Sequence, residues 1–218
     1  MGIKENYLRI QSEIPDVRII AVSKYVSSEE ILKAYQAGIR DFGESKVQDA
    51  EKKRLELSEK INKDIKWHFL GHIQTNKIKK IIGNFDYIHS LDSLKLAEIL
   101  SDSAKAKGIM QKIFIQVNVA EENTKYGFKI DELKECFEKI LNLKSLKITG
   151  LMTMAPFTGE ESIQREVFKK LKQLKIDLQN DYKVNIPELS MGMSNDYKIA
   201  CDEGATMVRI GRVLFNES

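Results

Sequence analysis

Short apolar runs and longer amphipathic stretches alternate along the whole chain. The apolar runs are rich in β-branched residues and have the length of buried strands. They lie at residues 17–22, 39–42, 67–70, 87–89, 113–119, 148–154, 188–191 and 207–210. Between them, apolar residues recur at helical spacing among charged ones, at residues 29–37, 47–61, 94–107, 132–143 and 163–179. Strands that alternate with helices predict βαβ units and a parallel sheet.

Eight strand candidates in 218 residues favour a single (β/α)₈ barrel of the TIM type over an open, doubly wound α/β sheet. An open sheet usually has a glycine-rich turn after its first strand, whereas the first apolar run here leads directly into Ser23 and Lys24. No low-complexity linker interrupts the pattern, so we expect residues 1–218 to form one domain. We also expect an extra N-terminal helix at residues 1–13 across the bottom of the barrel, and a vestigial or missing eighth helix.

Two helix starts have the spacing of a capping box, in which a serine or threonine and a glutamate three residues later cap each other's backbone N–H groups. Ser27 with Glu30 and Thr158 with Glu161 have this spacing. We therefore expect one helix to begin after Ser27 and another after Thr158.

The composition excludes several classes of protein. Lys and Arg number 35 against 32 Asp and Glu, and a net charge of +3 gives no reason to expect nucleic acid or a membrane as partner. No run reaches the ~18 apolar residues of a membrane span, and no signal peptide is recognisable. Cys136 and Cys201 form no CxxC pair and are expected to be buried, inert thiols in a reducing compartment. We therefore expect a cytoplasmic protein.

Lys24 is the first candidate for chemistry, because working residues of such barrels lie at the C-terminal ends of the strands. It directly follows an apolar run, which would place its stem in a dry wall and its amine at the barrel mouth. Schiff-base chemistry needs a neutral amine, and desolvation lowers the pKa of a lysine toward that state. From position alone, a surface lysine that happens to follow a strand is the simpler interpretation.

The loops after the last two strands favour a site. Gly192 and Ser194 precede a predicted helix start, which offers N–H groups and a hydroxyl to an anion. Gly211 directly follows the last strand and allows close backbone approach. Each glycine alone fits an ordinary turn, but a phosphate site at these two loops recurs in this barrel. Together with an inward Arg209, the two loops indicate an anion site.

Other candidates are weaker. His68 and His72 are four residues apart, but His68 lies in a predicted strand, where that spacing does not bring two side chains together, so we expect no metal site. The basic residues at 77–80 fit the solvent face of a short helix. No GxxxxGK[ST], HExxH or GxSxG motif occurs, so nothing indicates a nucleotide site, a catalytic zinc or a serine hydrolase.

Seven motifs carry a resemblance to a known family. They are Ala-Val-Ser-Lys at 21–24, Phe-Gly-Glu at 42–44, Trp-His-Phe-Leu-Gly at 67–71, Gln-Thr-Asn-Lys at 74–77, Gly-Leu-Met-Thr-Met at 150–154, Leu-Ser-Met-Gly-Met-Ser at 189–194 and Met-Val-Arg-Ile-Gly at 207–211. With these motifs in family order, the chain closely resembles the pyridoxal phosphate homeostasis proteins. That family is similar to the N-terminal barrel of bacterial alanine racemase.

The resemblance implies that the chain binds pyridoxal 5′-phosphate (PLP) as a Schiff base on Lys24. It also implies that Ser194 and the backbone at Gly211 and Arg212 hold the phosphate, and that Arg209 faces the pyridine nitrogen. The interval of fifteen between Ser194 and Arg209 is the one found in the racemase barrel.

Two positions depart from the family pattern. Ser45 and Lys46 stand where the family usually has Asn-Tyr, and His72 stands where it usually has proline. The shorter side chain at Ser45 puts a contact with the cofactor ring in question. Neither departure touches the lysine or the phosphate residues.

The residue implied at the pyridine nitrogen bears on catalysis. The Arg209 guanidinium keeps its proton, so the ring nitrogen would stay unprotonated, whereas many PLP enzymes place a carboxylate there. Racemisation further needs a base on each face of the substrate carbon. In the racemase the second base comes from a separate C-terminal domain, and this chain ends soon after Gly211. We therefore expect no catalytic residue and no efficient turnover.

The resemblance thus favours a protein of intracellular cofactor homeostasis that stores, buffers or delivers PLP, with apo-enzymes as partners that receive it. Nothing in the loops demands a second copy to complete the site, so we expect a monomer. The alternative is a PLP-dependent amino-acid racemase or lyase of low activity, with a tyrosine such as Tyr126 as the base of a slow side reaction.

Overall fold

The computed structural model describes residues 2–62, 64–122 and 125–215, and within them a closed barrel of parallel strands runs in sequence order from β1 to β8. The strands are β1 (Arg18–Val22), β2 (Asp41–Glu44), β3 (Lys66–Phe69), β4 (Tyr87–Leu91), β5 (Gln111–Gln116), β6 (Leu146–Met152), β7 (Glu188–Met193) and β8 (Met207–Ile210). β8 pairs with β1 from Arg18 and Met207 to Ala21 and Ile210, which closes the barrel. The predicted (β/α)₈ architecture is confirmed.

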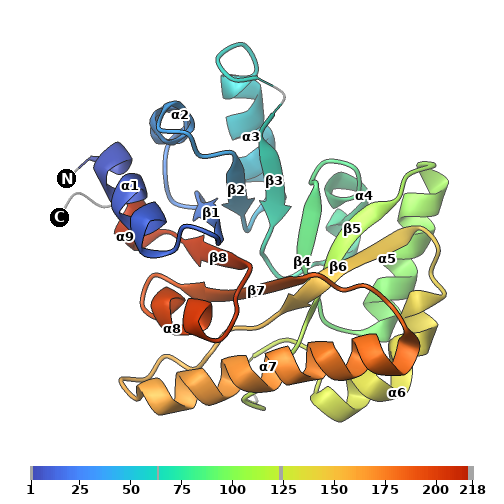
Figure 1. Cartoon of the computed structure of the whole chain (residues 1–218). Helices are drawn as coiled ribbons and strands as arrows, with labels where there is room; N and C mark the ends of the chain where they lie inside the picture. Colours follow the sequence, from blue (N-terminus) through green and yellow to red (C-terminus); the bar gives the residue numbers. More distant parts are fainter. Residues whose placement is uncertain (1, 63, 123–124, 216–218) are drawn as a thin grey trace.

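Helices on the outside of the barrel connect most of the strands (Figure 1). They are α1 (Ile3–Glu13), α2 (Ser28–Gln36), α3 (Val47–Leu57), the 3₁₀ turn η1 (Thr75–Lys77), α4 (Ile78–Ile81), α5 (Leu94–Ala106), α6 (Ile130–Leu141), α7 (Glu161–Tyr182), α8 (Tyr197–Asp202) and α9 (Arg212–Phe215). In the basic segment at 77–80, Ile78 is buried while Lys79 and Lys80 are exposed, as predicted for the solvent face of a short helix.

The alternation of side chains along the strands produces two separate cores. Residues that point inward fill the barrel, where Ile20, Phe114, Met152 and Met207 form one cluster. Residues that point outward pack against the helices in a much larger cluster. Because successive side chains of a strand lie on opposite faces, a polar residue at an inward position is enclosed by the barrel itself.

The N-terminal helix α1 lies elsewhere than we predicted. It packs beside α2 and α9 on the outside of the barrel, and not across its bottom (Figure 1). The vestigial α9 has only four residues, which is too short to cover the outer faces of β8 and β1. α1 buries Asn6 and Ile10 there, and Asn6 Nδ2 donates to the Leu214 carbonyl oxygen at 3.2 Å. α1 therefore takes the place of the eighth helix.

The two expected capping boxes have different outcomes. At α2 the Ser27 hydroxyl accepts the Glu30 N–H, and the Glu30 carboxylate accepts the Ser27 N–H at 2.7 Å, as predicted. At α7 the prediction was wrong, because the N-cap is Glu160. The Thr158 hydroxyl accepts the Glu160 N–H at 3.1 Å and closes a local turn before the helix, which is the competing use of such side chains.

Candidate functional site at the barrel mouth

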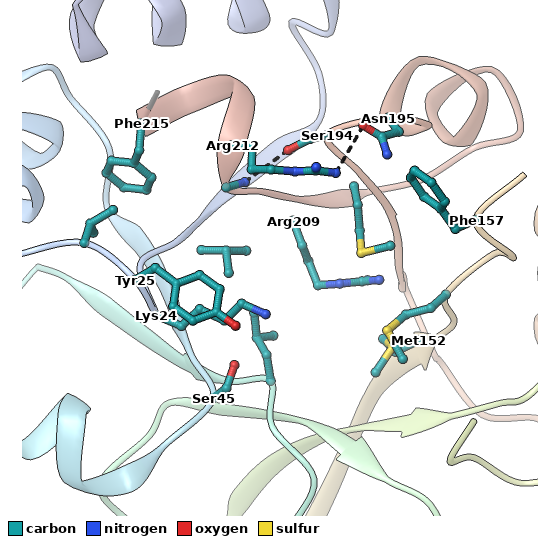
Figure 2. Close-up of a pocket in the computed structure, with 16 residues that line it drawn as sticks. Lys24, Tyr25, Ser45, Met152, Phe157, Ser194, Asn195, Arg209, Arg212 and Phe215 are labelled. Carbon is teal, nitrogen blue, oxygen red and sulfur yellow. Dashed lines mark hydrogen bonds between the residues drawn. The ribbon is translucent and has the colours of Figure 1, made fainter. Parts of the chain in front are cut away.

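The C-terminal ends of the strands surround a cavity of about 390 Å³ at the barrel mouth. Small-molecule sites in proteins have volumes of roughly 300–1,000 Å³. All five residues singled out from the sequence line this cavity: Lys24, Ser194, Arg209, Gly211 and Arg212. Figure 2 labels four of them, all but Gly211. They come from the ends of β1, β7 and β8, so closure of the barrel brings together segments almost 200 residues apart.

The lining combines positive charge with an apolar wall. Lys24, Arg209 and Arg212 are its charged residues, and no Asp or Glu is among the described residues that line the cavity. The apolar wall includes Val22, Leu70, Met152 and Met154. This combination suits a ligand with a flat apolar body and an anionic group.

Lys24 lies at the mouth but not in the dry wall that we expected. It is exposed, and its amine lies 4.9 Å from the centre of the Tyr25 ring, which is itself 88% exposed. β1 ends at Val22, so the side chain of Lys24 starts above the last strand position and is not enclosed by neighbouring strands. Its amine points into the cavity (Figure 2). The expectation of a desolvated stem was therefore wrong, while the expected position of the amine agrees with the structure.

Arg209 is held rigidly beneath the cavity. Its Nη1 donates to the backbone oxygen and the hydroxyl of Ser190 at 2.7 and 2.9 Å, and its Nη2 donates to the Thr153 carbonyl oxygen at 2.9 Å. Burial lowers the pKa of Arg209 to about 10, against the favourable field of Asp196. The guanidinium therefore remains charged at neutral pH.

The loops after β7 and β8 meet beside Arg209. Ser194 Oγ accepts the Gly211 N–H at 3.4 Å, and an Arg212 Nη lies 3.5 Å from Asn195 Oδ1 (Figure 2). Gly192 makes the first loop possible: its φ is +92°, and a Cβ there would lie 2.6 Å from the Cβ of Ala200. A hydroxyl, a backbone N–H and a guanidinium consequently converge on one corner of the cavity.

A buried ion pair lies behind the lysine loop. Lys53 Nζ, from α3, donates to Glu44 Oε1 at 2.9 Å and to the Ser23 carbonyl oxygen at 2.6 Å. Ser23 Oγ donates to the same Glu44 oxygen at 2.6 Å. Glu44 Oε2 is buried with no hydrogen-bond partner among the described residues. This cluster fixes the backbone directly before Lys24.

The positions that depart from the family pattern lie at the rim. Ser45 lines the cavity opposite Ser194 (Figure 2). His72 is stacked on Tyr126 with 3.8 Å between ring centres, and its Nδ1 lies 3.3 Å from Asp92 Oδ2. Tyr126 is 56% exposed and is not one of the described residues that line the cavity.

Sequence reasoning missed the polar groups that support the cavity. The Phe-Gly-Glu motif contains Glu44, but nothing local pairs it with Lys53 nine positions later. His68 was weighed against His72, and the structure separates these two and places His68 beside His89 of the next strand. One signal could have predicted these groups. Several strands each carry a polar residue at an inward position, and considered together these residues would meet inside the barrel.

The structure also bears on the excluded functions. No group of three or more His, Cys, Asp or Glu side chains in the described part of the chain could hold a metal ion. Of the helices described, none combines the length and apolar character needed to cross a bilayer. Cys136 is buried and Cys201 half-buried, and burial raises the pKa of the Cys201 thiol to about 11.

Fold and cavity together define the class of protein. The chain belongs to the family described as alanine racemase, N-terminal domain, whose model matches residues 2–218. Two similar curated proteins are named pyridoxal phosphate homeostasis protein. The protein from Aquifex aeolicus is 42% identical over 200 residues, which cover 92% of this chain and 86% of the relative. The protein from Synechocystis is 39% identical over 203 residues, which cover 93% of this chain and 92% of the relative. Within the family, the chain belongs to the pyridoxal phosphate homeostasis proteins.

Solved structures agree with this assignment. PipY of Synechococcus elongatus PCC7942, solved with PLP bound, is 36% identical and superposes with a TM-score of 0.92 over 99% of this chain and 100% of its own. Alanine racemase of Clostridium difficile 630 has a TM-score of 0.81 at 16% identity, and this chain covers 57% of it. The second likeness shows the shared barrel fold alone.

Proposed function

We propose that this chain binds pyridoxal 5′-phosphate at the barrel mouth and takes part in its intracellular homeostasis by storing, buffering or delivering it. The observation that carries the proposal is the cavity in which a lysine, two arginines and a serine converge, with no carboxylate among its described lining residues. The cofactor has an aldehyde, a pyridine ring and a phosphate. The amine, the apolar wall and the anion-binding corner match these three parts, and the similar PipY was solved with PLP bound.

Lys24 is the residue that we expect to hold the cofactor covalently. Its nitrogen would add to the aldehyde carbon, a C=N bond would form, and one water molecule would leave, giving a Schiff base. The exposed side chain can reach a ligand in the cavity without first breaking a buried contact. The hydrogen bond from Lys53 to the Ser23 carbonyl oxygen fixes the backbone before Lys24, and with it the position from which the side chain starts.

Ser194, Gly211 and Arg212 are the residues that we expect to hold the phosphate. The Ser194 hydroxyl and the Gly211 N–H already lie together, and both can donate to phosphate oxygens. The exposed guanidinium of Arg212 adds charge at the same corner. Arg209, deeper in the cavity, would then face the ring nitrogen.

We further propose that the bound cofactor is held without efficient turnover. A charged Arg209 donates hydrogen bonds but supplies no proton to the ring nitrogen, so negative charge that develops on a substrate carbon gains little stabilisation. Tyr126, the base considered for the alternative of a slow racemase or lyase, is stacked on His72 and outside the cavity lining. Both observations favour a carrier over an enzyme.

The remaining features of this proposal are a single domain over residues 1–218, a monomer, a cytoplasmic location, and apo-enzymes as recipients of the cofactor. Each stays a prediction.

Spectroscopy and chemical trapping test the proposal directly. The protein is expected to be yellow as purified, with the absorption band of a Schiff base, and borohydride is expected to fix the cofactor to one peptide. Mass spectrometry of that peptide is expected to show the adduct on Lys24. An adduct on another lysine, or none with wild-type protein, would contradict the proposal.

A further inference from the structure

A row of hydrogen-bonded side chains crosses the barrel interior beneath the cavity. Arg209 Nη1 lies 2.9 Å from Ser190 Oγ, and Ser190 Oγ lies 3.0 Å from His89 Nδ1. His89 Nε2 lies 2.9 Å from His68 Nδ1, and His68 Nε2 lies 2.9 Å from Asp41 Oδ1. The five residues come from β8, β7, β4, β3 and β2. We call this row the interior chain.

All hydrogen bonds of the interior chain are donated in the same direction, from Arg209 toward Asp41. A carboxylate accepts and cannot donate, so His68 must carry its proton on Nε2 to bond Asp41. A neutral His68 then accepts at Nδ1, and His89 must donate from its own Nε2. His89 Nδ1 in turn accepts the hydroxyl proton of Ser190, whose oxygen accepts from Arg209. The guanidinium at the other end can only donate, so both ends require the same direction.

The surroundings favour the uncharged form of both histidines. His68 and His89 are fully buried, and His68 is stacked on Tyr87 at 4.7 Å while His89 is stacked on Phe114 at 4.1 Å. Desolvation lowers the pKa of both, for His68 against the pull of Asp41, and for His89 with added repulsion from His68 and Arg209. Burial and these pKa directions therefore favour an interior chain that links the Arg209 guanidinium to the Asp41 carboxylate through neutral groups.

The guanidinium is held by its outer nitrogens. Nη1 and Nη2 bond to Ser190 and Thr153, whereas Nε has no hydrogen bond to any described residue. The wall of the barrel thus fixes the plane of the guanidinium while the group still lines the cavity.

We propose that Asp41, His68, His89 and Ser190 are positioning residues that hold the Arg209 guanidinium in one orientation against the ring of the bound cofactor. This inference rests on the proposed function, in which Arg209 faces that ring. The four residues do not line the cavity, so they act through Arg209 alone.

The first test uses the cofactor-free protein and does not depend on PLP binding. Proton–nitrogen correlation spectra of protein labelled with ¹⁵N-histidine are expected to show His68 and His89 as neutral Nε2–H tautomers from pH 5.5 to 9. His68→Gln and His89→Gln assign the two signals. An Nδ1–H tautomer of either histidine would overturn the proposal, as would protonation near the ordinary pKa of about 6.5.

The second test breaks the interior chain and reads the cofactor. His89→Leu removes both hydrogen bonds, whereas His89→Gln keeps an acceptor for Ser190 and a donor for His68 on one side chain. With PLP bound, His89→Leu is expected to raise the pH midpoint of the Schiff-base absorption by about one unit. The guanidinium then keeps its bonds to the Ser190 and Thr153 carbonyl oxygens but loses a fixed Ser190 hydroxyl, so it can tilt away and repel a proton near the ring less strongly. His89→Gln is expected to stay near the wild-type value.

The control is His72→Gln, at the third histidine, which lies outside the interior chain. Equal shifts in His89→Leu and His89→Gln, or no shift in His89→Leu with PLP bound, would overturn the proposal. If His89→Leu does not fold, the tautomers measured in the wild-type protein still test the proposal. Absence of any PLP binding by the wild type would refute the proposed function and leave the tautomer test intact.

Discussion

Two cations reach the same cavity in opposite states. Lys24 is exposed, and its amine lies over the Tyr25 ring. Arg209 is 5% exposed, and its outer nitrogens make three hydrogen bonds to the barrel wall. One cation therefore lies at the exposed outer edge of the site, and the other is fixed in its floor.

The difference follows from what each group is proposed to do. A lysine that forms and exchanges a covalent bond needs a mobile amine, whereas a cation that orients a ring needs a constant position. The two cations are accordingly supported in different ways. Lys53 and Glu44 fix the backbone before Lys24 and leave its side chain free, while strand residues fix the guanidinium of Arg209 itself.

The largest expected effect comes from removing the exposed cation. Lys24→Ala is expected to abolish the Schiff-base absorption band of the PLP complex and all trapping by borohydride. Weaker, non-covalent binding should persist, because the phosphate corner at Ser194 and Gly211 is intact. Equilibrium dialysis measures that residual binding. Lys46→Ala, at an exposed lysine in a neighbouring loop, is the control and should behave as wild type; an equal loss there would break the distinction.

The next effect tests the support behind Lys24. Lys53→Met leaves the Glu44 carboxylate buried without its cation, and breaking a buried pair in this way costs about 3–5 kcal/mol of unfolding free energy. The Lys53 side chain is 11% exposed, whereas Lys52 beside it is 78% exposed and 3.8 Å from Glu56. Lys52→Met should therefore cost at most about 1 kcal/mol. Urea unfolding measures both, and similar losses would show that the buried pair does not support the loop.

A smaller effect tests the anion-binding corner. Removal of the Ser194 hydroxyl takes away a hydrogen bond to a charged group, worth roughly 1.5–3 kcal/mol. Ser194→Ala is then expected to weaken PLP binding by about one to two decades. Pyridoxal, which lacks the phosphate, should lose far less. Ser45→Ala, on the opposite wall, should not discriminate between the two ligands. Equal losses for PLP and pyridoxal in Ser194→Ala would show that this hydroxyl does not touch the phosphate.

The smallest expected effect is the turnover of amino acids by the PLP complex. If Arg209 stays charged and fixed, amino acids should change the spectrum of the PLP complex without turnover near the ordinary ~1–10³ s⁻¹. Incubation with L- and D-amino acids in deuterium oxide tests this, with proton NMR for exchange at the α-carbon and chiral chromatography for inversion. Rapid exchange or inversion that is lost in Lys24→Ala would favour the racemase or lyase alternative.

The sequence by itself determined the barrel and the position of its chemistry. The period-two and helical patterns are local, so they predicted the alternation of β1 to β8 with helices without any knowledge of contacts. Strand ends then placed Lys24, Arg209 and Gly211 at the mouth, because a parallel barrel gathers all C-terminal strand ends on one face. The Ser27 cap was predictable because it is also local: both partners lie within four residues.

Only the tertiary structure decided how these groups are held. The exposure of Lys24 depends on where the strand wall stops, and the place of α1 depends on an outer face left uncovered by the short α9. His68 meets His89, and Lys53 meets Glu44, through the spacing of strands and helices in space. Hydrogen bonds across 2.9 Å require partners that the chain brings together only on folding, and no local pattern contains that information.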